Sequence, residues 1–197
     1  MENNNFDLDA LLGQVNMNGV SAESTGFQDL PSGYYLCEVE SAELGTSKSS
    51  GLPQVKMVLK VIQNGIIEVT DEEGNVYLSR AKGTKNRKIY KYYSLDPNKD
   101  FEKAVKTVVS DLLKFEGDTP GVELLGEILR DEEGKLITPS TALLQGSLEA
   151  IQGFSIYVKS DTQPSKKNPQ EKTTFSNLIG WARAEKLHLL EVPSDEE

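Results

Sequence analysis

Residues 54–63 read Gln-Val-Lys-Met-Val-Leu-Lys-Val-Ile-Gln, and apolar and basic side chains alternate along most of this stretch. Successive side chains of a β-strand point to opposite faces, so the alternation predicts a strand with one buried face. We expect the buried face to carry Val55, Met57, Leu59 and Val61. The opposite face carries Lys56 and Lys60 together with Val58 and Ile62.

The segments around residues 54–63 extend this pattern into a sheet. Tyr34–Leu44 also alternates, and the small residues of 45–53 form a loop, so the two runs predict an antiparallel hairpin. Residues 76–79 and 87–95 predict further strands, and residues 154–160 with 173–181 predict a closing hairpin. We also expect one helix from Asp96 as N-cap and Pro97 as first residue to Phe115, and another from Thr138 to Gln152.

These elements predict a mainly β protein with helices, of the α+β class. Strands at both ends with helices between them favour a small closed antiparallel sheet over alternating strand and helix units. The length and the hydrophobic fraction of 37% fit one domain. We expect a mobile acidic N-terminal arm at residues 1–29, a folded domain at 30–186 and an acidic C-terminal tail at 187–197.

The formal net charge of -10 argues against a simple electrostatic nucleic-acid binder, but the charges are unevenly placed. Residues 1–47 hold eight acids and no Lys or Arg, and the last seven residues hold four more acids. Removing these twelve from the 31 acids leaves 19 against 21 basic residues between Lys48 and Leu190. The acidity therefore belongs mainly to the ends of the chain.

Several classes of protein are disfavoured by the sequence. One Cys and one His can form neither an internal disulfide nor a zinc site of Cys and His ligands, which fits a reducing compartment. No apolar run approaches the ~20 residues that cross a bilayer, and the N-terminus lacks signal-peptide features, so we expect an intracellular protein with no membrane partner. Phosphate-loop, zinc-protease and serine-hydrolase motifs are absent. We expect no enzyme activity, no cofactor and no metal.

Residues 79–95 combine positive charge with aromatic rings. Lys and Arg neutralise phosphates and aromatic rings stack on bases, which is the combination that single-strand binding requires. In a strand, Lys88, Tyr90 and Tyr92 share one face and Lys91 and Tyr93 the other, so at least one Tyr should lie in the core. We expect the strand acids Glu38, Glu40 and Glu43 to lie within the fold, away from the binding face. The six basic residues of the segment are Arg80, Lys82, Lys85, Arg87, Lys88 and Lys91.

An alternative interpretation of this segment is a Lys-protected edge strand together with a solvated loop. A second basic patch favours binding, because a long hairpin loop can clamp an extended strand, although such a loop can also be plain surface. This patch consists of Lys159, Lys166, Lys167 and Lys172, flanked by Phe175 and Trp181.

Three blocks of the chain resemble bacteriophage single-stranded DNA-binding proteins. Residues 30–62 resemble the opening hairpin of that family, residues 87–95 and the following helix its middle, and residues 153–180 its closing hairpin. The resemblance covers roughly residues 27–182. It implies that residues 30–186 form an OB-fold barrel, with residues 118–152 as a helical insertion, that coats single-stranded DNA without sequence specificity in phage replication or recombination.

The resemblance also implies phage replication or recombination proteins as partners and the cytoplasm of an infected bacterium as the location. The acidic tail is similar to tails that recruit such partners, although it ends in acids and the bacterial pattern ends in apolar residues. The oligomeric state, including a homo-oligomer, stays open. Resemblance and residue pattern together predict DNA contacts at Lys48, Lys56, Lys60, Arg80, Lys82, Lys85, Arg87, Lys88, Tyr90, Lys91, Tyr92, Lys166, Lys167 and Trp181.

Two other functions compete with this one. A viral protein-interaction module, or an inhibitor of a host enzyme, could use an acidic surface to mimic nucleic acid. An enzyme acting on nucleotides or DNA ends would need carboxylates that converge in a cleft.

Overall fold

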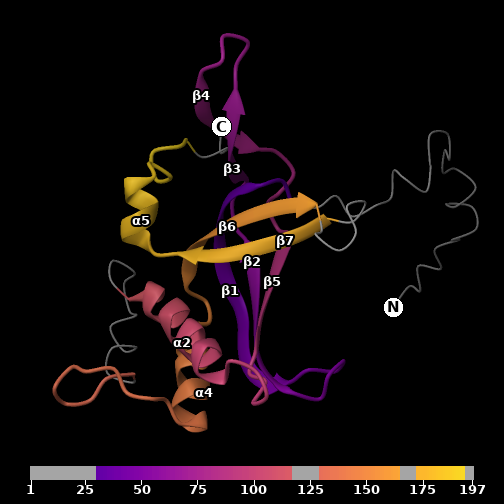
Figure 1. Ribbon diagram of the computed structural model, residues 1–197. Helices are drawn as coiled ribbons and strands as arrows, with labels where there is room; N and C mark the ends of the chain where they lie inside the picture. Colours follow the sequence, from indigo (N-terminus) through magenta and orange to yellow (C-terminus); the bar gives the residue numbers. More distant parts are fainter. Residues whose placement is uncertain (1–29, 117–128, 165–171, 194–197) are drawn as a thin grey trace, which may run out of the picture.

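The computed structural model describes residues 30–116, 129–164 and 172–193 and shows a mainly β fold of the α+β class (Figure 1). The described residues contain seven antiparallel strands, which form one sheet, and three α-helices. The strands are β1 (Gly33–Thr46), β2 (Pro53–Val61), β3 (Gly65–Thr70), β4 (Val76–Ala81), β5 (Lys88–Ser94), β6 (Ser155–Pro164) and β7 (Lys172–Ile179). The helices are α2 (Phe101–Leu112), α4 (Thr141–Ala150) and α5 (Trp181–Lys186), and the 3-10 turn η1 (Leu113–Phe115) follows α2.

Some expectations fall outside the described residues. These are the N-terminal arm at 1–29, residues 118–128 of the helical insertion, Lys166 and Lys167 in the last hairpin loop, and the final four residues of the tail.

The long strand β1 organises the sheet. It pairs with β2 along Cys37–Thr46, with β6 along Gly33–Glu38, and with β3 at Tyr34. The strand order is β4-β3-β1-β2-β5, with β6 on β1 and β7 on β6. The expected hairpins β1–β2 and β6–β7 are confirmed. The expected closed barrel is not confirmed, because the described parts of β5 and β7 share no backbone ladder.

The inward faces of the strands form the core. Val55, Met57, Leu59 and Val61 are all fully buried, so the prediction for β2 is confirmed. The sheet packs against α2 and α4, whose buried apolar side chains belong to the same cluster. Gly65 at the start of β3 lies directly on the ring of Tyr35, since a Cβ there would come within 2.2 Å of a ring carbon. Any larger residue at position 65 would displace that ring.

The helix after β5 begins later than predicted. Asp100 caps it by accepting from the backbone N–H of Lys103, so Phe101 is its first residue. Asp96 instead accepts from the N–H of Asn98 in a turn, and this hydrogen bond is the main cause that lowers the pKa of the Asp96 carboxyl. The chain offers two Asp residues four positions apart, and the second one serves as N-cap.

A second, smaller cluster covers the outer face of β6 and β7. It contains Tyr157, Ile179 and Leu189, and α5 supplies Ala184. Helix α5 is not among the elements predicted from the sequence, and it has no side-chain N-cap. Residues 187–193, predicted from the sequence to belong to the C-terminal tail, pack against this second cluster through the buried Leu189. No helix in the described ranges is long and apolar enough to cross a membrane.

Candidate nucleic-acid interface

Strand β5 divides its side chains between the core and the surface. Tyr90 and Tyr92 are 53% and 56% exposed, whereas Tyr93 is 7% exposed and donates its hydroxyl hydrogen bond to Oδ2 of Asp111. Burial and the negative charge of Asp111 raise the pKa of Tyr93. The predicted division, with Lys88, Tyr90 and Tyr92 on one face and one Tyr in the core, is confirmed.

Strand β2 places lysines beside these rings. In the β2–β5 register, Lys56 lies opposite Tyr92 and Lys60 lies opposite Lys88. Directly opposite residues of antiparallel strands have Cβ atoms about 4.5–5.5 Å apart, so cations and rings share one surface. We call this surface the β2–β5 face; it consists of Lys56, Val58, Lys60, Lys88, Tyr90 and Tyr92.

Strand β1 borders the β2–β5 face with acids, which corrects the expectation that Glu38, Glu40 and Glu43 lie away from it. Oε2 of Glu40 is 2.6 Å from Nζ of Lys88, and Oε1 of Glu43 is 3.6 Å from Nζ of Lys56. The hydrogen bond to Glu40 is the main cause that raises the pKa of Lys88. The ladder has a register shift between Val39 and Ser41, at Glu40, which lets Glu43 as well as Glu38 point outward.

Lys91 lies on the opposite side of β5 from the β2–β5 face. Its side chain is 13% exposed, and its Nζ lies 3.4 Å from Oδ2 of Asp111 and 4.9 Å from the ring centre of Tyr93. The same Nζ donates a hydrogen bond to the carbonyl oxygen of Ser176 in β7, at 2.7 Å. The structure therefore separates Lys91 from Lys88, Tyr90 and Tyr92.

Arg80 and Trp181 also have partners within the protein. The guanidinium of Arg80 donates to the carbonyl oxygens of Asn64, Val192 and Pro193, at 2.8 to 2.9 Å. Nε1 of Trp181 donates to the carbonyl oxygen of Ser155, and its ring contacts Tyr157 edge to face. Arg80 therefore holds Val192 and Pro193 against β4, and Trp181 packs against the second cluster.

The remaining predicted cations that the structure describes lie in loops. Lys48 is exposed in the β1–β2 loop, and Lys82 and Lys85 are exposed between β4 and β5. Oδ1 of Asn64 accepts from the N–H groups of Thr84 and Lys85, which fixes this second loop. Arg87 follows it, half-buried, immediately before β5.

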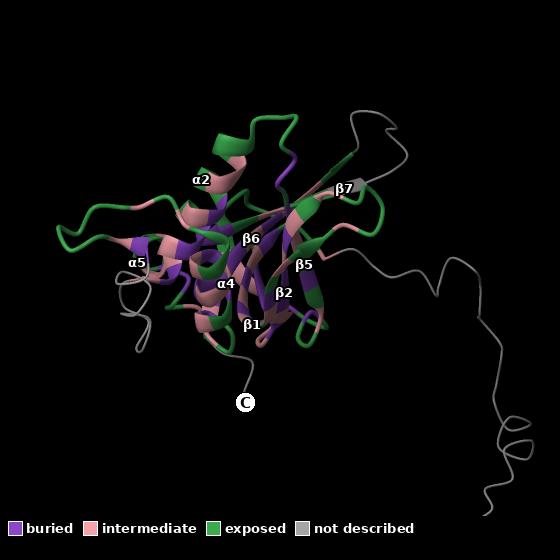
Figure 2. Ribbon diagram, turned by 90° about the horizontal axis from the view of Figure 1, so that it is seen from below, coloured by how far each residue is buried: buried purple, intermediate pink, exposed green. Residues whose placement is uncertain are grey.

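Phe175 is an exposed aromatic residue that the predicted site does not include. It lies on β7 and is 53% exposed, next to Ser176, the residue that accepts from Lys91. Figures 1 and 2 show β7 beside β5. Further along β7, Leu178 belongs to the main core and Ile179 to the second cluster, so the two faces of the strand alternate. Phe175 shares a face with Ile179, and this alternation could have placed Phe175 on the outer face of the sheet.

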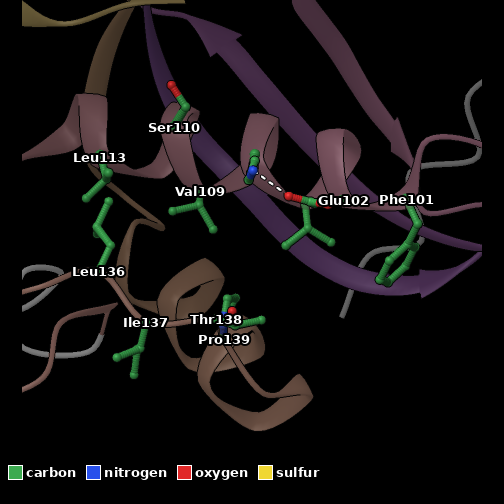
Figure 3. A pocket seen from close by; sticks show the side chains of 11 residues that line it. Phe101, Glu102, Val109, Ser110, Leu113, Leu136, Ile137, Thr138 and Pro139 are labelled. Carbon is green, nitrogen blue, oxygen red and sulfur yellow. Dashed lines mark hydrogen bonds and ion pairs between the residues drawn. The ribbon is translucent and has the colours of Figure 1, made fainter.

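A groove of about 640 Å³ lies between α2 and residues 136–139 (Figure 3). Most of its lining is apolar, and its one cation, Lys106, forms an ion pair with Glu102. A phosphate backbone needs a row of cations, which this groove does not offer. In the described ranges, no group of three or more His, Cys, Asp or Glu side chains could hold a metal ion.

Comparison with models of known protein families and with curated proteins gives no match to this chain.

Proposed function

We propose that this protein binds single-stranded DNA without sequence preference, through the β2–β5 face. The observation that carries the proposal is that Tyr90 and Tyr92 are exposed on the same face as Lys56, Lys60 and Lys88. Rings stack on any base, and lysines follow a backbone whatever its sequence. The proposed role is coating of single strands in phage replication or recombination, with the proteins of those processes as partners, in the cytoplasm of an infected bacterium.

The connectivity supports an OB-like arrangement for this function. OB folds are partly open five-stranded barrels that bind oligonucleotides on their second and third strands and on two neighbouring loops. Here β1, β2 and β5 are consecutive neighbours, and β6 returns to β1 and pairs with β7. In this arrangement β2 and β5 are the second and third strands, the β3–β4 hairpin is inserted between them, and Lys48 lies in the first binding loop.

The ion pairs of Lys56 and Lys88 are compatible with binding. All four side chains are between 34% and 58% exposed, and exposed pairs contribute only about 0–1 kcal/mol. A phosphate can therefore replace either carboxylate at low cost. The proposed contacts comprise this face, Phe175, and the loop cations Lys48, Lys82, Lys85 and Arg87.

Fluorescence anisotropy with a labelled oligo-dT, at two salt concentrations, tests the proposal. The triple variant K56A/K60A/K88A should lose affinity by about tenfold or more, and its salt slope should fall by about 2, since each phosphate contact contributes roughly 0.7. The matched control is K99A/K103A/K106A, which removes three exposed lysines on or just before α2. Equal losses in the two variants, or no binding by the wild type, would contradict the proposal.

A further inference from the structure

The three carboxylates of β1 form a row beside the lysines of the β2–β5 face. Glu38 lies opposite Lys60 in the β1–β2 register, and Glu43 lies opposite Lys56 and pairs with it. Glu40, at the register shift, reaches Lys88 on β5. Adjacent strands are about 4.8 Å apart, so the backbone of β1 runs roughly 5 Å from that of β2 and 10 Å from that of β5, while the carboxylates of Glu40 and Glu43 reach across to the lysines.

A single strand can bind without approaching this row closely. Its bases can stack on Tyr90 and Tyr92 while its phosphates contact the lysines from the side of β5, whose outer edge has no ladder in the described residues. Where a phosphate displaces Glu40 or Glu43, the freed carboxylate takes up a cation from solution. That uptake offsets part of the counterion release that drives binding.

A duplex cannot avoid the row in the same way. It offers no unstacked base faces to Tyr90 and Tyr92, and it carries two backbones about 6 Å apart across the minor groove and 12 Å across the major groove. When one backbone of the duplex contacts the lysines of β2, its second backbone comes close to the carboxylates of β1. Like charges at such distances repel, which weakens duplex binding.

We propose that Glu38, Glu40 and Glu43 determine the preference of this protein for single-stranded over double-stranded DNA. The inference rests on the proposed function and assigns to β1 a part of the interface that repels the wrong ligand. Specificity of this kind depends on repulsive elements as well as attractive ones.

The test compares E40Q/E43Q with E72Q/E73Q. Both variants change the net charge by the same amount, and Glu72 and Glu73 are exposed in the β3–β4 turn, away from the β2–β5 face. Anisotropy titrations use a labelled oligo-dT and a labelled hairpin duplex at several salt concentrations. Circular dichroism and thermal unfolding establish that both variants fold, and E38Q is a third variant on the same strand.

In E40Q/E43Q, affinity for the duplex should rise by roughly two- to fivefold per carboxylate, and affinity for oligo-dT should rise less. The salt slope for oligo-dT should steepen by up to about 1.4, which is two lysines at roughly 0.7 each. E72Q/E73Q should keep the wild-type ratio of the two affinities. An unchanged ratio in E40Q/E43Q, or an equal change in the control, overturns this inference alone. A wild type that binds neither ligand overturns the proposed function, and this inference with it.

Discussion

Nζ of Lys91 and the carbonyl oxygen of Ser176 are 2.7 Å apart, and this hydrogen bond joins β5 to β7 where the two strands share no backbone ladder. The same ammonium group also lies beside the buried carboxylate of Asp111. Lys91 comes from the most basic segment of the sequence, yet it stabilises the fold from within. One strand thus uses its two faces for separate purposes.

The first prediction separates the two faces of β5. Lys91→Met should destabilise the protein by about 1–3 kcal/mol, because it leaves Asp111 with one partner fewer in a buried place. Lys88→Met, on the exposed face, should leave stability nearly unchanged and weaken binding to oligo-dT. Urea unfolding and anisotropy titrations check the two effects. Equal stability losses in the two variants would contradict this division.

The second prediction concerns base stacking. Tyr90→Ala and Tyr92→Ala should each weaken oligo-dT binding by about 1–3 kcal/mol, because each removes a surface on which a base stacks. Tyr77→Ala is the control, since Tyr77 is 50% exposed but lies on β4 in the projecting hairpin. If all three variants bind equally well, the exposed tyrosines of β5 do not stack on bases.

The third prediction extends the site across the junction of β5 and β7. Phe175→Ala should weaken binding of oligonucleotides of about 12 nucleotides more than binding of those of about 4, because only the longer ones reach β7. Phe101→Ala, which removes a ring that is 46% exposed on α2, should change neither affinity. If the loss of affinity in Phe175→Ala is the same for short and long oligonucleotides, Phe175 does not lie at the far end of the DNA site.

The fourth prediction concerns Arg80. Arg80→Ala removes the donors to the carbonyl oxygens of Val192 and Pro193, so residues 187–193 should exchange amide hydrogens faster. The loss of affinity for oligo-dT should be smaller than in Lys88→Ala. Hydrogen exchange followed by mass spectrometry measures the first effect. Unchanged exchange together with a large loss of affinity would instead support a DNA contact at Arg80.

The fifth prediction concerns alkaline pH. Burial raises the pKa of Tyr35 from 10.0 to about 12, and the pKa of Tyr93 is raised as well. Because the folded protein holds these protons more tightly than the unfolded chain, their contribution to stability is complete below pH 10 and is lost as the pH rises towards 12 and beyond. Urea midpoints measured across this range should fall, and should fall less steeply in Tyr93→Phe. A midpoint that stays constant would contradict the raised pKa values.

Local alternation predicted the parts of the fold that depend on near neighbours. The buried face of β1 as far as Val39, the fully buried face of β2 and the opposite orientations of Tyr92 and Tyr93 follow from a period of two. The partners of Lys91 and Arg80 could not be predicted this way, because Ser176 and Val192 lie 85 and 112 residues further along the chain. From the sequence alone, a basic side chain in a basic segment is predicted to face solvent or a ligand, because its distant partner within the fold is not visible there.

The register shift on β1 limits how relatives of this protein can be recognised. With strict alternation after Val39, Glu43 would face the core, whereas the extra residue at Glu40 puts Ala42 there instead. A relative that lacks the extra residue therefore aligns with the strand beyond Glu40 only when a one-residue gap is placed there. A search profile that permits a one-residue insertion at this position would keep the acidic row aligned, and a homologue that lacks the insertion should also lack the row.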